Sequence, residues 1–470
     1  MIEPTRQLGD SLKDSVGYNV CIRFASIQRI AVGIDGRPCN VLFQQYNYSP
    51  QADTFSDICF ETLTPPLLEE FEFHRSLTGD NAKDYRKYKH RVGFLDEGHS
   101  MVSSYAPHLR VELVHDPGLI DRFLTMCRES GIAQSVIMRF PSHLPLLAIK
   151  KGFFSGKRLH KLRKGMAFPW SITFQLEALL LNGLLNTGDL EQLIPLISSL
   201  SEEHSKFGPR YVADFLRYYH EALKIRKATD SPIACFYEKL RNFKYSEPQP
   251  SLDIRCCHVT FTPTRILLEG PYATQSNRVI RQYQGYEDHF IRVDFRDEDM
   301  LQYRWDREVD GTFFLNTRVG DTLKTGFELA GRDFEFLAYS NSALREHSVW
   351  FVNPFQHPIK GRVNAASIRD SLGNFKGDDL LKQPSKLAAR LAQAFTATDA
   401  SAMIQRCEWE EVEDLDCPIE PHLFTDGVGT ISRNLAQRIW SKHCEDKHIT
   451  KPSVEPYAVS HFNNFKGIRE

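Results

Sequence analysis

Hydrophobic and polar residues alternate in short runs over residues 18–115, as in strands with one buried face. Two such runs are residues 20–24 and 41–43, and turn residues such as Asp-Gly-Arg-Pro at 35–38 separate them. Strand-sized runs between turns are typical of a small β-rich domain. We therefore predict β-structure over this part of the chain.

The hydrophobic period changes at Trp170, where apolar side chains begin to recur at helical spacing. Stripes that mix aromatic and aliphatic residues are typical of helices that face a core. The sequence predicts one helix from about residue 170 and a second over 211–227. Their core-facing residues would be Ile172, Leu176, Leu179, Leu180, Gly183, Phe215, Tyr219 and Leu223.

Strand-like patterning returns after Glu-Pro-Gln-Pro at 247–250, a segment whose prolines favour a linker. Residues 290–295, 311–318 and 334–339 are predicted as strands of a mixed sheet that ends near residue 353. The polar segment 356–379 is predicted as a loop with at most one short helix.

A basic stretch separates the first β-rich region from the helices. Residues 149–169 contain no Asp or Glu, and Phe153 and Phe154 lie among the lysines and arginines. Cations interleaved with aromatic rings suit phosphate contacts combined with base stacking, which makes Lys157, Arg158 and Lys161 candidates for nucleic-acid binding. A solvated linker between domains explains the same composition, and both interpretations stay open.

Overall composition is that of an ordinary globular protein, with 41% hydrophobic and 25% charged residues and a formal net charge of −2. Any nucleic-acid surface must therefore be local. The 10 cysteines form no C-x-x-C pair, which favours buried thiols of a reducing compartment over disulfides or zinc. The N-terminus lacks a signal-peptide pattern, and the longest apolar run, 178–185, is much shorter than the ~20 residues that span a bilayer. We expect a soluble protein of the cytoplasm or nucleus.

The most informative motif is F-T-D-G-V-G-T-I-S at residues 424–432. Gly427 and Gly429 permit backbone angles that other residues avoid, and Ser432 can cap a following helix. The apolar stripe of that helix would consist of Leu435, Ala436, Ile439 and Trp440. The motif predicts a strand that turns into a helix.

This motif resembles the F-T-D-G-x-G-x-I-S stretch that opens the first double-psi β-barrel of cellular RNA-dependent RNA polymerases, the enzymes of RNA silencing. Further blocks follow in the family's order, with fainter similarity back to about residue 169. They are T-P-T-R-I at 262–266, N-R-V-I-R at 277–281, F-I-R-V-D-F at 290–295, L-R-E-H-S-V-W-F at 344–351 and A-A-R-L-A-Q-A-F at 388–395. Several blocks in one order are far more specific than any single block.

The resemblance implies a multidomain α+β architecture, which we divide by composition and pattern. The predicted parts are a β-rich N-terminal domain (1–148), a basic linker (149–168), a helical neck (169–246), a mixed β slab (247–380), and a helix followed by the start of an incomplete double-psi β-barrel (381–470).

Polymerases need clustered carboxylates to hold two divalent cations at the reacting phosphate. The family uses a D-x-D-G-D loop in a second barrel, C-terminal to the F-T-D-G motif, and this sequence contains no such loop. Asp426 is interpreted as a turn residue, and the acids at 297–299, 310, 377–379 and 414–416 as capping or solvated groups. We therefore assign no catalytic residue and no metal ligand, and expect Mg²⁺ only in the complete enzyme.

Several basic residues in the family blocks are candidates for contact with RNA or nucleotides. Arg278, Arg281, Arg292 and Arg345 could each contact RNA or pair inside the protein. His347, near Trp350, is predicted to be a hydrogen-bonded packing residue.

Lys466-Gly467 resembles the K-G step that closes a P-S-A-x-Q-[IF]-R-x-x-G-x-K-G run of the family, in which the lysine would face nucleotide or template phosphates. Pro452-Ser453 matches the start of that run. Residues 454–461 replace its A-x-Q-I-R portion, and Pro456 is unsuited to a central strand.

The resemblance implies RNA-templated RNA synthesis in gene silencing, with a single-stranded RNA template, nucleoside triphosphates and other silencing proteins as partners. For these 470 residues we predict the N-terminal and template-handling part, inactive by itself. One alternative is a non-catalytic RNA-binding or scaffold protein derived from the same fold. Another is an unrelated enzyme that uses Asp426 or the acids near Asp297.

Overall fold

The fold of the 470-residue chain is that of a computed structural model. The described residues are 16–22, 27–35, 55–62, 66–72, 89–94, 108–114, 118–129, 162, 167–185, 187–225, 231–246, 253–298, 300–302, 309–373, 375, 381–399, 402–410, 412, 428–446, 449, 459–462 and 465–468. No helix among them is long and apolar enough to cross a membrane.

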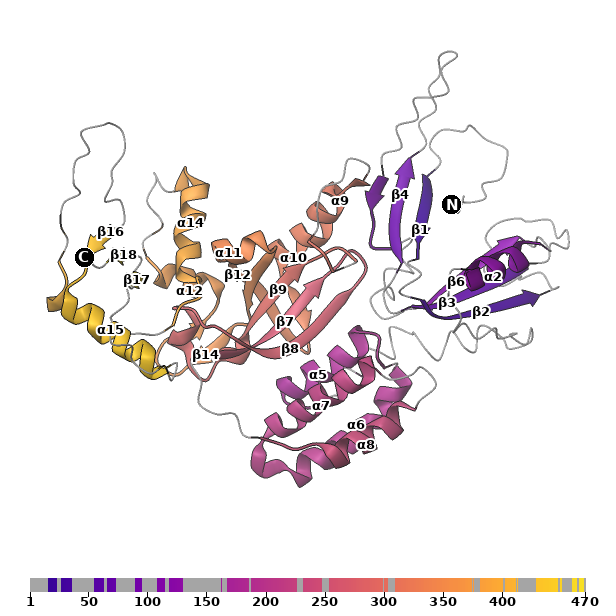
Figure 1. Ribbon diagram of the computed structural model, residues 1–470, viewed down its shortest axis with the longest axis horizontal. Helices are drawn as coiled ribbons and strands as arrows, with labels where there is room; N and C mark the ends of the chain where they lie inside the picture. Colours follow the sequence, from indigo (N-terminus) through magenta and orange to yellow (C-terminus); the bar gives the residue numbers. More distant parts are fainter. Residues whose placement is uncertain are drawn as a thin grey trace, which may run out of the picture.

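Two small sheets form the N-terminal region, as the alternating pattern predicts (Figure 1). The first contains β1 (Val16–Cys21), β4 (Leu67–Glu72) and β5 (Lys89–Arg91), and is extended by β10 (Val309–Asp310) from much later in the chain. The second contains β2 (Ile27–Asp35), β3 (Phe55–Thr62) and β6 (His108–Val114). The helix α2 (Leu119–Glu129) covers this second sheet, where Cys127 joins a core with Ile30 and Ile58.

A helical bundle follows, and it confirms the helices predicted from Trp170 and over 211–227. Its elements are α5 (Trp170–Leu181), α6 (Thr187–Glu203), η2 (Ser205–Phe207), α7 (Pro209–Lys224) and α8 (Pro232–Asn242). The helix α5 has apolar residues on more than one face, and it is buried on two sides. Ile172 and Leu176 face the bundle core, whereas Phe174 and Ala178 pack on the neighbouring sheet.

That neighbouring sheet has six strands in the order β11-β12-β13-β9-β7-β8. Only β7 and β9 are parallel among these neighbours. The strands are β7 (Ile254–Phe261), β8 (Ile266–Thr274), β9 (Phe290–Phe295), β11 (Phe327–Leu329), β12 (Arg332–Ala338) and β13 (Ser348–Val352). The predicted strands at 290–295 and 334–339 are thus confirmed, the second shifted at its ends.

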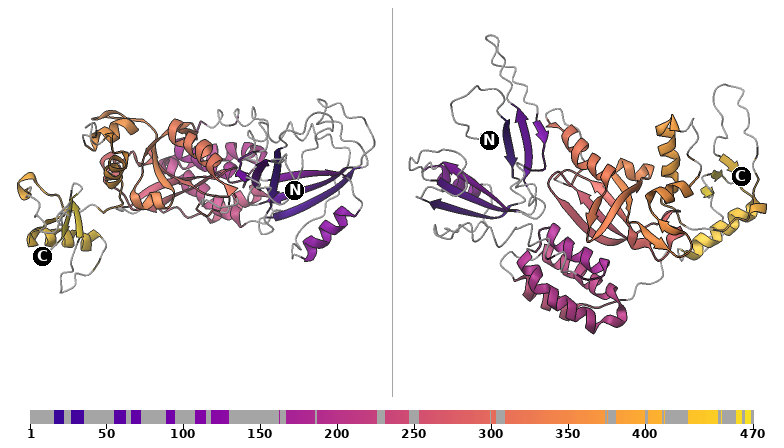
Figure 2. Two further views of the ribbon diagram at one scale, coloured as in Figure 1. Left: turned by 90° about the horizontal axis from the view of Figure 1, so that it is seen from above. Right: turned by 180° about the vertical axis from the view of Figure 1, so that it is seen from behind.

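The second face of the sheet is covered by several short elements, which Figure 2 shows from behind. They are η3 (Ile280–Tyr283), η4 (Glu287–His289), the β14–β15 hairpin (Phe355–His357 and Gly361–Val363), α12 (Ala365–Ser371) and α14 (Pro384–Ala394). Trp350, Ile368 and Phe395 are buried in their common core. The helix α14 confirms the helix expected from the A-A-R-L-A-Q-A-F block.

Side chains from the bundle complete the open edge of the sheet at β8. Asn182 holds both backbone groups of Leu268, donating to its carbonyl at 2.8 Å and accepting from its N–H at 2.9 Å. Gln175 donates to the Gly270 carbonyl at 2.8 Å, and Arg217 to the Pro271 carbonyl at 2.8 Å. An uncovered edge strand would leave these groups available to another chain. The bundle therefore satisfies the edge strand and fixes itself to the sheet.

The predicted strand over 311–318 is wrong. Residues 312–325 form α9 (Thr312–Phe314), the π-helix η5 (Leu315–Val319) and α10 (Gly320–Thr325). Aromatic and β-branched residues gave this segment a strand-like composition, but tertiary contacts of Arg318 decide its conformation. The segment 356–379 also contains a β-hairpin that was predicted as loop, although its short helix is present as α12.

The F-T-D-G region forms a small separate sheet in the order β16-β18-β17. Its elements are η6 (Arg406–Glu408), β16 (Val428–Thr430), α15 (Arg433–Asp446), β17 (Val459–Phe462) and β18 (Phe465–Ile468). The Ser432 hydroxyl accepts the Leu435 N–H at 3.3 Å, so the predicted helix cap is confirmed. Residues 424–427 of the motif lie outside the described residues.

Candidate nucleic-acid interface

The T-P-T-R block is a buried turn between β7 and β8. Thr262 and Thr264 are 0% and 2% exposed, and Arg265 is 8% exposed. The Thr262 N–H donates to the Arg265 carbonyl at 3.0 Å, and the Arg265 N–H donates to the Thr262 hydroxyl at 2.9 Å. The Thr262 hydroxyl thus closes the turn, and the buried side chains of the block are not exposed to a ligand.

Two charged residues, Glu298 and Arg318, hold this turn through hydrogen bonds. The Glu298 carboxylate accepts both the backbone N–H and the hydroxyl of Thr264 at 2.6 Å, and lies 3.8 Å from the Arg265 guanidinium. Arg318 from η5 donates to the Thr262 and Arg265 carbonyls at 3.2 and 3.1 Å. Burial raises the pKa of Glu298 and lowers the pKa of Arg318. Because buried charges need such partners, Glu298 and Arg318 belong to the scaffold.

Arg281 and Arg292 also make contacts within the protein. Arg281 donates to the carbonyl of Thr398 and, at 2.9 Å, to its hydroxyl, which ties η3 to the segment after α14. Arg292 donates through Nε to the Ser348 hydroxyl at 2.6 Å, between the central strands β9 and β13. For both residues these contacts favour pairing inside the protein over contact with RNA.

Arg278 and Arg345 differ from those two arginines. Neither guanidinium has a hydrogen-bond or ion-pair partner among the residues that the structure describes, and Arg345 is exposed at the end of α11 (Asn341–Arg345). The helix α11 packs against α14, and Asn277, next to Arg278, pairs with Ala397 just after α14. Arg278 and Arg345 therefore both adjoin this helix.

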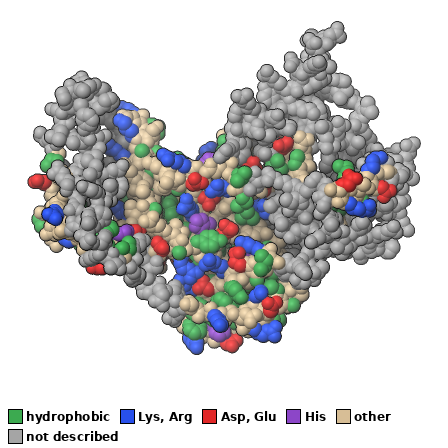
Figure 3. Space-filling view, in the orientation of Figure 1, with side chains coloured by type: hydrophobic (Ala, Val, Ile, Leu, Met, Phe, Trp, Pro, Cys, Tyr) green, Lys and Arg blue, Asp and Glu red, His purple; other side chains and the backbone are tan. Residues whose placement is uncertain are grey.

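The helix α14 adds two cations that sequence reasoning missed. Lys386 and Arg390 are exposed one turn apart, and neither side chain has a partner in the described part of the chain. Figure 3 shows Lys and Arg side chains over α14 and along the adjoining margin of the sheet. We call Arg278, Arg345, Lys386 and Arg390 the cationic edge. Its signal in the sequence was the Lys386–Arg390 spacing within a predicted helix.

The remaining basic candidates lie elsewhere. Lys157, Arg158 and Lys161 are outside the described residues. Lys466 lies in β18, whose parallel register with β16 places it opposite Val428 of the F-T-D-G motif. The motif and the K-G step are thus neighbouring strands of one sheet.

His347 occupies the turn that follows α11, in the left-handed region at φ 53°. Its N–H donates to the Leu344 carbonyl at 2.9 Å, and its carbonyl accepts the Phe295 N–H at 3.0 Å. These contacts come from the backbone, so the turn explains the residue without acid–base chemistry.

Among the described residues, the acidic side chains do not gather into a metal site. No group of three His, Cys, Asp or Glu side chains in the described part of the chain could hold a metal ion. Glu298 is used by the T-P-T-R turn, and Asp294 is engaged by His258 and Ser348. Burial pushes the pKa of Asp294 up, but hydrogen bonds from His258 and Ser348 outweigh it and hold that pKa below its usual value. Asp378, Asp379 and Asp426 are outside the described residues. The carboxylates that the structure describes thus do not fit a two-cation centre.

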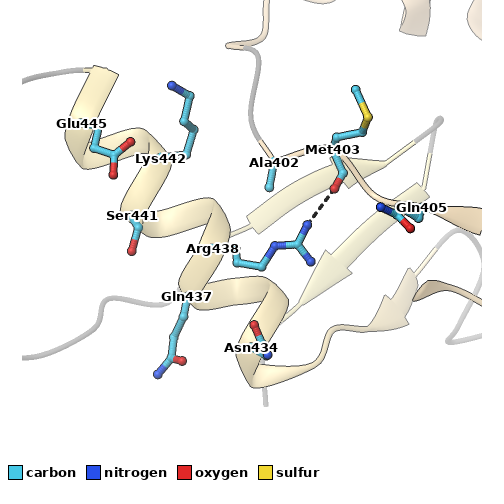
Figure 4. A pocket seen from close by; sticks show the side chains of 9 residues that line it. All are labelled: Ala402, Met403, Gln405, Asn434, Gln437, Arg438, Ser441, Lys442 and Glu445. Atoms are coloured by element: carbon cyan, nitrogen blue, oxygen red, sulfur yellow. Dashed lines mark hydrogen bonds between the residues drawn. The ribbon is translucent and has the colours of Figure 1, made fainter. Parts of the chain in front are cut away.

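One cavity of about 630 Å³ lies between α15 and residues 402–405 (Figure 4). Arg438 crosses it to donate to the Met403 carbonyl at 2.8 Å and to the Glu408 carboxylate at 2.6 Å. Lys442 is paired with Asp446 at 2.8 Å. Both cations of the lining are therefore neutralised, so the cavity is poorly suited to a nucleotide phosphate.

Comparison with known proteins finds one family along this chain. The model of the RNA dependent RNA polymerase family matches residues 261–460. "RNA-dependent RNA polymerase 1" of Arabidopsis thaliana is 29% identical over 334 residues, which cover 65% of this chain and 27% of the relative. "RNA-dependent RNA polymerase 1" of Schizosaccharomyces pombe is 30% identical over 269 residues, covering 57% of this chain and 20% of the relative.

A rice protein, "Probable RNA-dependent RNA polymerase 2" of Oryza sativa, is 31% identical over 198 residues, covering 40% of this chain and 17% of its own length. The solved structure of RNA dependent RNA polymerase QDE-1 from Thielavia terrestris aligns with a TM-score of 0.36 at 14% identity, covering 50% of this chain and 28% of that one. The chain spans between 17% and 27% of these curated relatives. The chain is thus similar to RNA-dependent RNA polymerases over the region that contains the ordered sequence blocks.

Proposed function

We propose that this chain serves RNA-templated RNA synthesis in gene silencing, and that its part in that reaction is to hold the single-stranded RNA template. Similarity to RNA-dependent RNA polymerases supports the reaction class. The cationic edge carries the proposal for the template, because four exposed or half-exposed cations adjoin one helix and none is neutralised by a described residue. Unpaired Lys and Arg side chains gathered about one helix suit contact with phosphates of a nucleic-acid backbone.

The F-T-D-G sheet is proposed to begin the first double-psi β-barrel. The parallel pairing of β16 with β18 supports this, since it sets Lys466 beside the motif strand. In this proposal Lys466 faces nucleotide or template phosphates. The chain would also retain the division into N-terminal domain, neck, slab and barrel start that the sequence suggests.

Catalysis in this proposal depends on Mg²⁺ held by a D-x-D-G-D loop, which these 470 residues do not contain. Two divalent cations would activate the attacking 3′-hydroxyl and stabilise the leaving pyrophosphate. The described residues contribute scaffold and template contacts to this reaction. Nucleoside triphosphates and other silencing proteins would be partners of the complete enzyme.

Binding of fluorescent single-stranded RNA by the purified 470-residue protein tests the proposed template role. We expect affinity to fall steeply with salt, and the Arg345→Ala/Arg390→Ala variant to bind more weakly. Arg241→Ala is the matched control, because Arg241 is exposed on α8 of the bundle. Equal loss in the control would contradict a template role for the cationic edge.

Nucleotide incorporation on the same RNA, with Mg²⁺ and nucleoside triphosphates, tests the second part of the proposal. We expect no product from the 470-residue chain. Robust synthesis would show that its own carboxylates suffice.

A second candidate is a non-catalytic RNA-binding or scaffold protein derived from the same fold, which the unpaired cations of the cationic edge favour. Sequencing the transcript beyond codon 470 separates the two. An in-frame D-x-D-G-D supports the polymerase, whereas a stop codon supports the RNA-binding alternative.

A further inference from the structure

The T-P-T-R turn is in direct contact with the N-terminal sheet. Gly93 lies just beyond β5, and a Cβ atom added there would be 2.2 Å from the Pro263 carbonyl oxygen. No side chain fits at that distance, because both groups are backbone and cannot rotate away. The backbone around Gly93 therefore rests on the turn itself.

A second contact joins the same two regions. The strand β10 extends the N-terminal sheet by parallel pairing with β5, with Val309 opposite Lys89 and Asp310 opposite His90. The helix α9, which follows β10, also packs against β5, and Figure 1 shows it reaching from the large sheet toward β4. The N-terminal sheet is thus held at the turn and at the start of α9.

Both contacts adjoin the same two charged residues, Arg318 and Glu298. The chain continues from α9 directly into η5, where Arg318 binds the two carbonyls of the T-P-T-R turn. The Thr322 hydroxyl donates to the Arg318 carbonyl at 2.6 Å and holds η5 to α10. A π-helix is rare and often occurs at functional positions. Glu298 completes the set by accepting two hydrogen bonds from Thr264.

We propose that the T-P-T-R turn is the docking surface for the N-terminal sheet of the same chain, with Glu298 and Arg318 as positioning residues that keep the turn in its docking shape. Gly93 supplies the close contact, and β10 supplies the second point of attachment. Two separate attachments fix an orientation, whereas one would act as a pivot. The junction sets the direction of the N-terminal sheet relative to the large sheet, and it does not depend on the proposed RNA synthesis.

Distance measurement between two labels in the 470-residue chain tests the junction. Spin-labelled non-native residues would replace Cys21 in β1 and Tyr237 on α8, both of which are exposed. We expect one narrow distance distribution in the otherwise unchanged protein, and a broad one after Gly93→Val. The thermal transition of the helical bundle should stay unchanged. A distribution of the same width in Gly93→Val would overturn the proposal.

Further variants separate docking from folding. Val309→Pro removes a backbone donor of β10 without enlarging the turn contact, and should broaden the distribution in the same way. Glu298→Gln keeps an acceptor for Thr264 and should broaden the distance distribution less than Glu298→Ala.

Gly331→Ala is the control, because a Cβ there meets nothing within 4 Å although φ is +76°. Broadening by Gly331→Ala equal to that of Gly93→Val, or none from Val309→Pro, would contradict the docking surface.

Discussion

The T-P-T-R turn and three residues of the cationic edge lie in sequence blocks that resemble those of RNA-dependent RNA polymerases, yet the charged residues at the two places are in opposite situations. At the turn, Arg265 and Glu298 are buried and paired with each other, and the half-buried Arg318 donates to backbone carbonyls. At the edge, Arg345 and Arg390 are exposed and have no partner in the described part of the chain. A charged residue in a family block can thus maintain the fold or contact a ligand, and its burial and bonding distinguish the two.

The comparison predicts that scaffold residues affect stability, whereas edge residues affect RNA binding. The largest effect is expected from Glu298→Ala, which would leave the buried Arg265 without its carboxylate. Breaking a buried pair in this way costs about 3–5 kcal/mol. Denaturant unfolding should show this loss, and Glu346→Ala is the control because Glu346 is exposed. A decrease in unfolding free energy below about 1 kcal/mol would contradict a structural role for Glu298.

A pH effect of similar size is expected in the bundle, at His220. Burial lowers the pKa of His220 to about 4, from its usual value of 6.5, and the nearby Lys224 adds to the shift. Its Nε2 accepts a hydrogen bond from the Asn182 amide at 2.8 Å, because the Asn182 oxygen already accepts the Leu268 N–H. Protonation of Nε2 would place its N–H opposite the Asn182 amide N–H, so that this hydrogen bond would be lost.

The sign of the effect follows from the two pKa values. Above pH 6.5 histidine is neutral in both folded and unfolded chains, so the full stability is present. As pH falls from 6.5 to about 4, only the unfolded chain takes up this proton, and stability decreases by about 3 kcal/mol. Unfolding free energies measured from pH 7.5 to 4 check this. His220→Gln should flatten that part of the curve, and an unchanged curve would exclude His220 as its cause.

A smaller loss is expected from Arg281→Ala, which removes two hydrogen bonds to Thr398. A typical hydrogen bond contributes about 1 kcal/mol net, so the loss of two should lower the unfolding free energy by about 2 kcal/mol. The salt dependence of RNA binding should not change. A shallower salt dependence would show that Arg281 contacts RNA and would contradict its assignment to the scaffold.

The smallest stability effect is expected at the edge. Arg345→Ala and Arg390→Ala should each change the unfolding free energy by less than about 0.5 kcal/mol, because surface substitutions without partners usually do. Each should nevertheless weaken binding of single-stranded RNA at low salt. Loss of stability comparable to that of Arg281→Ala would show that these residues also belong to the scaffold.

Regular elements with strong periodicity were predictable from the sequence. The helices that contain Ile172 and Phe215, the strand at 290–295 and the cap at Ser432 are all present. The helical conformation of segment 311–318 was not predictable, because a long-range contact between Arg318 and the T-P-T-R turn overrides the local preference of the segment for a strand. The addition of β10 to the N-terminal sheet depends on residues more than 200 positions apart, which periodicity does not encode.

The candidate site was predictable only as a set of alternatives. Sequence left Arg278, Arg281, Arg292 and Arg345 between RNA contact and internal pairing, since an arginine in a strand or turn serves either purpose. Only the structure separates the bonded Arg281 and Arg292 from the unpaired Arg278 and Arg345. Lys466 stays a prediction, beside the F-T-D-G strand.

The most direct measurement is the salt dependence of single-stranded RNA binding by the unchanged protein, by Arg345→Ala/Arg390→Ala and by Arg281→Ala. Each phosphate contact contributes a slope of about −0.7 in log affinity against log salt on single strands. The edge variant should therefore have a slope shallower by about 1.4, and Arg281→Ala should keep the slope of the unchanged protein. An unchanged slope in the edge variant would contradict the division between a buried scaffold and an RNA-binding edge.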